Sequence, residues 1–119
     1  MRRLCRIDIK GSKEIDGKIM KFIEDLKKKI KIKKIILYGS YARRDFNEGS
    51  DIDTIIIGNF KEKFKDRIGK ILELTNLPIE PLCYTEKEFN KMIANRNPFI
   101  LSVINDTKNI FFSYEKEKQ

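Results

Sequence analysis

The segment that decides the fold is ILYGSYARRDFNEGSDIDTIII, residues 36–57. It begins and ends with short apolar runs, and polar residues follow the first run and precede the second. Gly39-Ser40 comes directly after the first run, and Asp51-Ile52-Asp53 opens the second after ten intervening residues. Apolar runs of this length are typical of buried strands. Because sheet proteins build their sites at strand ends, we expect these polar residues to form one.

On both sides of this segment, helical and strand patterns alternate along the chain. Helical apolar spacing covers 13–30 and 60–75, Thr85-x-x-Glu88 is a capping box, and Asn97-Pro98 begins a short helix. Strands are predicted at 34–38, 52–57, 79–84 and 109–113, with a further short helix at 41–45. The pattern predicts an α/β (α+β) chain with a small sheet covered by helices, and it leaves the strand directions open. The predicted core includes the side chains of Phe60, Phe64, Cys83, Phe89 and Phe99.

Composition limits the kinds of chemistry and location. The chain has 119 residues, the size of one domain, and no His, which excludes His-based acid–base catalysis and most zinc sites. Its Cys5 and Cys83 form no C-x-x-C motif and are expected as thiols. Neither a membrane-spanning apolar run nor a signal peptide is visible, which favours a cytoplasmic protein that binds no membrane.

The positive charge is concentrated at the N-terminal end. The net charge is +8, and residues 1–34 hold 13 Lys and Arg against 5 Asp and Glu, which accounts for all of it. Such a segment attracts nucleic acid, nucleotides or an acidic partner protein. The simpler interpretation, a solvated Lys-rich helix face, is the favoured one.

Asp51 and Asp53 predict a cation site. Residues i and i+2 of a strand point to the same side, so two carboxylates stand together, repel each other and raise each other's pKa unless a cation lies between them. Oxygen ligands suit Mg²⁺, with Mn²⁺ as the alternative. Gly39 lets a ligand approach the backbone, Ser40 offers a hydroxyl at a helix start, and Arg43 can neutralise phosphate charge. Taken separately, a Gly-Ser pair is usually a turn and an Asp-x-Asp is usually solvated.

The stretch GSYARRDFNEGSDID resembles the nucleotidyltransferase signature of the DNA polymerase β superfamily, and the chain length resembles its minimal nucleotidyltransferase (MNT) branch. The resemblance covers about residues 14–112 of a single domain, 1–119, leaving a basic segment, 1–13, and a polar tail, 115–119. It implies a polymerase β-like fold with a small mixed sheet, and transfer of a nucleoside monophosphate from an NTP, with ATP favoured, while pyrophosphate leaves. Two Mg²⁺ ions would be held by Asp51 and Asp53, and the nucleotide by Gly39, Ser40, Arg43 and Ser50.

The resemblance also implies a third carboxylate, for which Glu80 is the candidate. Glu80 is the one ionisable residue among apolar neighbours in the strand predicted at 79–84, where a charge is costly without a partner. The alternative is an edge-strand Glu that faces water, as Pro81 suggests. The family more often has Asp there. A second departure is Arg44, where the family commonly has Gly, which implies a changed turn or one more phosphate contact.

The resemblance further implies a partner. Minimal nucleotidyltransferases often pair with a HEPN protein as toxin and antitoxin, and some transfer AMP to a tyrosine of the toxin. Because nearly every residue serves the expected fold, we expect an open acceptor site that a partner completes. Two alternatives remain: a catalytically weak module that neutralises a toxin by contact, and a nucleotidyltransferase acting on nucleic acid or a small molecule.

Overall fold

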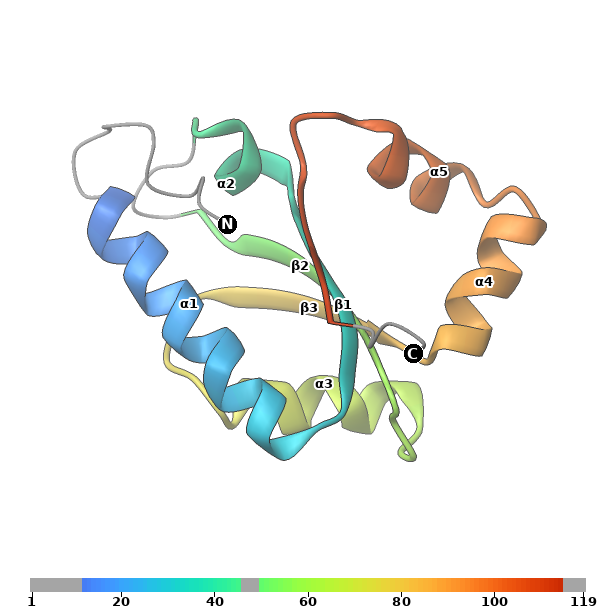
Figure 1. The fold of residues 1–119 in the computed structure, drawn as a ribbon, viewed down its shortest axis with the longest axis horizontal. Helices are drawn as coiled ribbons and strands as arrows, with labels where there is room; N and C mark the ends of the chain where they lie inside the picture. The colour runs from blue at the N-terminus through green and yellow to red at the C-terminus, as the bar shows by residue number, and fades with distance from the viewer. Residues whose placement is uncertain (1–11, 46–49, 115–119) are drawn as a thin grey trace, which may run out of the picture.

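A computed structural model describes residues 12–45 and 50–114 of the chain (Figure 1). Within these residues, nine helices and strands follow one another in the predicted order: α1 (Ser12–Lys29), β1 (Ile32–Tyr38), α2 (Gly39–Arg43), β2 (Ile52–Gly58), α3 (Phe64–Leu72), β3 (Ile79–Tyr84), α4 (Glu86–Ala94), α5 (Pro98–Asn105) and β4 (Ile110–Ser113). The α/β (α+β) prediction is confirmed. Most of the basic segment 1–13, the tail 115–119 and Cys5 lie outside the described residues.

The four strands form one mixed sheet in the order β3-β2-β1-β4. β1 runs antiparallel to both β2 and β4, whereas β2 and β3 run parallel and are connected through α3. A parallel pair needs such a crossover, which explains why a helix separates these two strands. β3 lies at an edge of the sheet, the position that Pro81 predicted.

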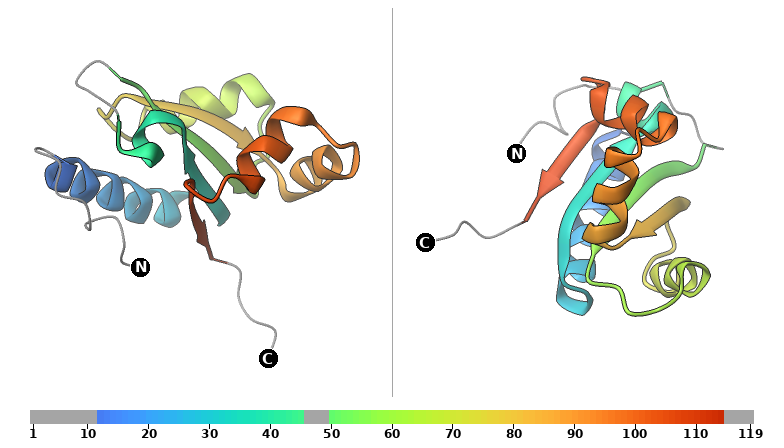
Figure 2. Two further views of the ribbon diagram at one scale, coloured as in Figure 1. Left: turned by 90° about the horizontal axis from the view of Figure 1, so that it is seen from above. Right: turned by 90° about the vertical axis from the view of Figure 1, so that its right-hand side faces the viewer.

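Helices cover both faces of the sheet (Figures 1 and 2). On one face, apolar residues of α1 and α3 pack against alternate residues of the strands, including Ile23, Ile35, Ile56, Ile71 and Cys83. On the other face, α4 and α5 pack against the remaining alternation, including Ile36, Ile55, Ile57, Phe89 and Ile100. The alternation of strand side chains therefore assigns each residue of the central segment to a face.

Local chemistry accounts for the two C-terminal helices. The Thr85 hydroxyl accepts a hydrogen bond from Glu88 N at 3.1 Å, and Thr85 N donates to Glu88 Oε1 at 2.9 Å, which confirms the capping box. Asn97 Oδ1 accepts from Ile100 N at 3.0 Å, and Pro98 occupies the first helical position. Within the described residues no helix is long and apolar enough to cross a membrane.

Some sequence-based boundaries and core assignments were wrong. α3 begins at Phe64 rather than at Phe60, because Phe60 N donates to Gly58 O in a turn, although Phe60 is buried as predicted. Phe64 and Phe99 are 38% and 41% exposed. Both lie in the first turn of a helix, where their rings contact Tyr84 and Tyr38, respectively, and remain open to solvent. Phe89 and Cys83 are buried, as predicted.

Candidate active site

Three polar residues form a row across one face of the sheet. In the strand register Tyr38 pairs with Asp53, and Asp53 pairs with Glu80. Partners in register share a face, and this is the face that α4 and α5 cover farther along the same strands. Residues distant in the sequence are thus brought to one end of the sheet, the end where β1 stops and where β2 and β3 start. The polar residues predicted to lie at strand ends therefore lie at one end of the sheet.

Asp53 is the electrostatic centre of this row. Burial, the adjacent Glu80 carboxyl within hydrogen-bonding reach, and Asp51 together raise the pKa of Asp53 above its ordinary value, while Arg43 lowers it. Two carboxyl groups that close disfavour simultaneous ionisation. The predicted crowding of carboxylates is present, but the closer partner of Asp53 is Glu80 on the neighbouring strand, and Asp51 acts on it more weakly.

Gly39 packs directly against the Asp53 carboxyl group. A Cβ atom placed on Gly39 would overlap Asp53 Oδ2 and would lie 3.2 Å from Asp53 Cγ. Its φ of +75° is also one that residues with a Cβ rarely adopt. Gly39 therefore serves two purposes, because it turns the chain from β1 into α2 and leaves room for the carboxyl group.

The other predicted site residues surround this centre. Asp51 is exposed and immediately precedes β2, and Ser40 and Ser50 are half-buried. Arg43 is exposed at the end of α2, where its Nε lies 3.3 Å from Asp45 Oδ2, and it is near enough to lower the pKa of Asp53. The structure thus gathers Gly39, Ser40, Arg43, Asp51, Asp53 and Glu80 at one end of the sheet, and it places Ser50 next to Asp51 in the chain.

The donor set of the row fits a hard divalent cation. The ligand atoms of Asp53 and Glu80 are carboxylate oxygens, which suit Mg²⁺ or Mn²⁺, and burial followed by the adjacent Glu80 carboxyl group raises the pKa of Asp53. Among residues 12–45 and 50–114, no three His, Cys, Asp or Glu side chains are close enough to form a complete metal site. The arrangement accordingly suits an ion that takes part of its shell from substrate phosphates, as Mg²⁺ commonly does.

An aromatic pair borders the row on the side of α5. The rings of Tyr38 and Phe99 meet edge to face, with their centroids 5.7 Å apart. Burial, and then the charges of Asp53 and Glu80, raise the pKa of Tyr38 to about 12. The Tyr38 hydroxyl therefore stays protonated at physiological pH, so it adds no third negative charge beside the carboxyl groups.

One contact at this end was missed by sequence reasoning. Arg44 donates two hydrogen bonds to Asp16 of α1, and the hydroxyl of Tyr41 donates a third to the same carboxylate. The sequence left two interpretations of Arg44, a changed turn and a phosphate contact. The first agrees better with the structure, because the guanidinium of Arg44 binds Asp16 of α1. A signal was available in the sequence: Asp16 is an acidic residue in phase with Ile19 and Ile23 of the apolar helix stripe.

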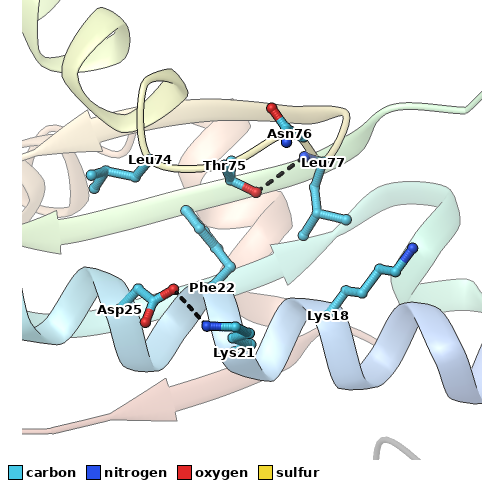
Figure 3. A pocket seen from close by; sticks show the side chains of 8 residues that line it. All are labelled: Lys18, Lys21, Phe22, Asp25, Leu74, Thr75, Asn76 and Leu77. Atoms are coloured by element: carbon cyan, nitrogen blue, oxygen red, sulfur yellow. Dashed lines mark hydrogen bonds and ion pairs between the residues drawn. The ribbon is translucent and has the colours of Figure 1, made fainter.

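A hollow of about 410 Å³ lies on the opposite face, away from the row (Figure 3). Its lining comes from α1 and from the segment between α3 and β3: Lys18, Lys21, Phe22, Asp25, Leu74, Thr75, Asn76 and Leu77. In Figure 3 Lys21 and Asp25 pair on α1 at one side of the hollow. None of the predicted site residues lines it.

Comparison with known proteins gives a consistent family assignment. Residues 19–110 match the family model described as nucleotidyltransferase domain. Two proteins of Methanocaldococcus jannaschii, each named "Putative protein adenylyltransferase", are 42% identical over 78 residues and 38% identical over 68 residues. These alignments span 63% and 57% of this chain, and 78% and 65% of the relatives.

A solved structure agrees at the level of the fold. It is described as a nucleotidyltransferase of Sulfolobus solfataricus, with the qualifier "putative" in that description. It superposes with a TM-score of 0.55 at 17% identity, covering 81% of this chain and 77% of that one.

Proposed function

Because this chain belongs to the nucleotidyltransferase domain family and is a nucleotidyltransferase, we propose that it transfers AMP from ATP to a hydroxyl group of a partner protein. The observation that carries the proposal is the packing of Gly39 against Asp53 beside Glu80, at one end of the sheet. The proposal is supported by this proximity of a glycine turn to two carboxyl groups, because carboxylate oxygens are ligands for a cation that accompanies phosphates. The choice of AMP and of a protein acceptor is supported by the names of the two Methanocaldococcus relatives.

The residues of the row have distinct roles in this proposal. Asp51, Asp53 and Glu80 do not form a complete metal site by themselves, so they would hold two Mg²⁺ ions only together with oxygens of the triphosphate. The ions would neutralise the triphosphate and make the acceptor hydroxyl more acidic. Ser40 and the backbone at Gly39 would hold the terminal phosphates, beside the Asp53 carboxyl group that fills the space next to Gly39. Arg43, which is exposed beside the row, would contact the phosphates, and Ser50 would orient Asp51.

Glu80 is the proposed proton acceptor. Its side chain is exposed on an edge strand, so an acceptor from another molecule can reach it while it lies next to Asp53. The acceptor oxygen would attack the α-phosphorus of ATP, and the bond from that phosphorus to the bridging oxygen of pyrophosphate would break. The hydroxyl proton would pass to the Glu80 carboxylate, leaving AMP esterified to the acceptor.

Label transfer tests the proposal. The protein would be incubated with Mg²⁺, each α-labelled NTP in turn and an extract of its own cells, and the products would be separated as protein, RNA and small molecules. Asp53→Asn would run beside the wild type. Asp66→Asn is the matched control, because Asp66 is an exposed carboxylate in the first turn of α3, away from the row.

We expect label from ATP on a protein band with the wild type and with Asp66→Asn, and none with Asp53→Asn. Label found on RNA or on a small molecule would replace the protein acceptor by the corresponding alternative. No transfer together with no ATP binding in calorimetry would refute the enzymatic proposal.

We propose in addition that the partner is a HEPN-family toxin and that this chain is its antitoxin. The support is the resemblance of the motif, residues 39–53, to that branch of the superfamily. The antitoxin role is tested by coexpressing this chain with a HEPN protein encoded by an adjacent gene. Rescue of growth by the wild type but not by Asp53→Asn is the expected result. Rescue by both would favour neutralisation by contact, and rescue by neither would exclude the antitoxin role.

A further inference from the structure

Arg44 has a backbone conformation that its side chain does not favour. It caps the C-terminal end of α2 with φ 65° and ψ 27°, the left-handed region, where glycine is the usual residue. A residue with a Cβ remains there only when its surroundings hold it. What holds Arg44 therefore needs to be identified.

The anchor is a buried carboxylate in the second turn of α1. Arg44 Nη2 lies 3.0 Å from Asp16 Oδ2, and Arg44 Nη1 lies 3.2 Å from Asp16 Oδ1. The two side chains are only 10% and 2% exposed. The hydroxyl of Tyr41, a fully buried residue, donates to the same carboxylate. Asp16 thus binds Tyr41, which belongs to α2, and Arg44, which directly follows that helix.

We propose that Asp16 is a positioning residue for the phosphate-binding turn, acting through Tyr41 and Arg44; this rests on the proposed function. α2 has only five residues and no side-chain hydrogen bond at its N-cap, so its own hydrogen bonds hold it weakly. Gly39, at its start, must keep a φ of +75° against Asp53. The contacts of Asp16 with Tyr41 and Arg44 hold α2 against α1. They keep the turn at Gly39 in one conformation before a nucleotide binds, so the site is preorganised.

A second Arg–carboxylate pair, in which the Arg is buried and the carboxylate is exposed, provides the control. Arg67 donates to both oxygens of Glu88, at 2.7 and 3.1 Å, with Arg67 7% and Glu88 46% exposed. This pair joins α3 to the start of α4, and the other hydrogen bonds of Arg67 go to the carbonyl oxygens of Glu62 and Cys83 rather than to α2. Glu88→Gln keeps the capping box, because the Gln oxygen can accept from Thr85 N, and it removes the negative charge and the hydrogen bond from Arg67 Nη2.

The experiment compares Asp16→Asn with Glu88→Gln in the full chain. Urea unfolding gives the stability of each variant, and calorimetry gives the Kd for ATP with Mg²⁺ in water, where both are folded. We expect Asp16→Asn to raise the Kd about tenfold or more, and Glu88→Gln to change it less than twofold even where it lowers stability. Equal Kd values for Asp16→Asn and wild type would overturn the proposal, as would equal increases in both variants.

Two further variants guard against a failure of Asp16→Asn to fold. Tyr41→Phe removes the hydrogen bond to Asp16 and leaves the ion pair between Asp16 and Arg44, so its Kd should rise by a smaller factor, about two- to fivefold. Arg44→Gly suits the left-handed backbone but loses the anchor, so it should raise the Kd about tenfold with less loss of stability. Wild-type affinity in Arg44→Gly would overturn the proposal. A wild type that binds no ATP would instead refute the proposed function itself.

Discussion

Replacing Gly39 by alanine tests the geometry on which the proposed site depends. The φ of +75° places the new Cβ in the left-handed region, which costs about 1–2 kcal/mol for a non-glycine residue. The same Cβ would overlap Asp53 Oδ2, so the carboxyl group must turn away or the backbone must shift. Because alanine restricts the unfolded chain, roughly 0.4–1 kcal/mol of the conformational cost is offset. The steric overlap adds to the remainder, so we expect a net destabilisation of about 1–2 kcal/mol.

Gly69→Ala is the matched control, since Gly69 lies inside α3 and a Cβ there would meet no atom within 4 Å. The control should stabilise the chain by roughly 0.5–1 kcal/mol, because alanine suits a helix better than glycine. Thermal unfolding followed by circular dichroism should show Gly39→Ala melting about 4–8 °C below the wild type. In calorimetry, Gly39→Ala should also lose affinity for ATP with Mg²⁺, and Gly69→Ala should keep it.

Two results would contradict this reasoning. If Gly39→Ala melts with the wild type and binds ATP equally well, then the turn does not pack against Asp53. If Gly69→Ala is destabilised to the same extent as Gly39→Ala, then the loss reflects a general intolerance of substitution at glycine rather than the contact with the carboxyl group.

Three further predictions concern the carboxyl row and a helix cap. Because the pKa of Asp53 is raised in the folded chain, the stability that this group contributes is fully present below its ordinary value of 3.8 and is lost as the pH rises through the raised value. In metal-free urea titrations, the advantage of Asp53→Asn over wild type should therefore grow from pH 4 to pH 7. Glu80→Gln should bind ATP with Mg²⁺ but lose about 10²–10⁴-fold in the rate of label transfer, measured at saturating ATP. Thr85→Ala should lower the free energy of unfolding by about 1 kcal/mol in urea, because it removes the hydrogen bond to Glu88 N.

Much of the fold follows from the order of patterns in the sequence. The apolar runs at 34–38, 52–57 and 79–84 and the helix signals at Thr85 and Asn97 depend on neighbouring residues, and each was found within a few positions. The order of strands in the sheet and the parallel pairing of β2 with β3 depend on contacts across the chain, which local patterns do not contain. The exposure of Phe64 and Phe99 was missed for the same reason, since helical spacing does not show how far the sheet extends beneath a helix.

The site was predictable where its residues carry charge or a special backbone. Gly39, Asp53 and Glu80 were selected for these properties, and the structure brings them together, although their catalytic roles remain predictions. The link from Asp16 to Arg44 was not foreseen. It joins residues 28 positions apart, so neither the acidic residue in the apolar stripe of α1 nor the departure noted at Arg44 could show that the two are paired.

At this end of the sheet two unfavourable backbone conformations are compensated, whereas the crowding of a pair of carboxyl groups is not. The left-handed backbone of Arg44 is held by a buried ion pair to Asp16, and that of Gly39 is relieved by the absence of a Cβ. The crowding of Asp53 and Glu80 has no comparable remedy, because burial and Glu80 outweigh the influence of Arg43 on the pKa of Asp53. Local inconsistencies of this kind are expected where function requires them. A divalent cation accompanying a triphosphate would supply the missing positive charge, so the feature that weakens the chain alone is the one that would bind its substrate.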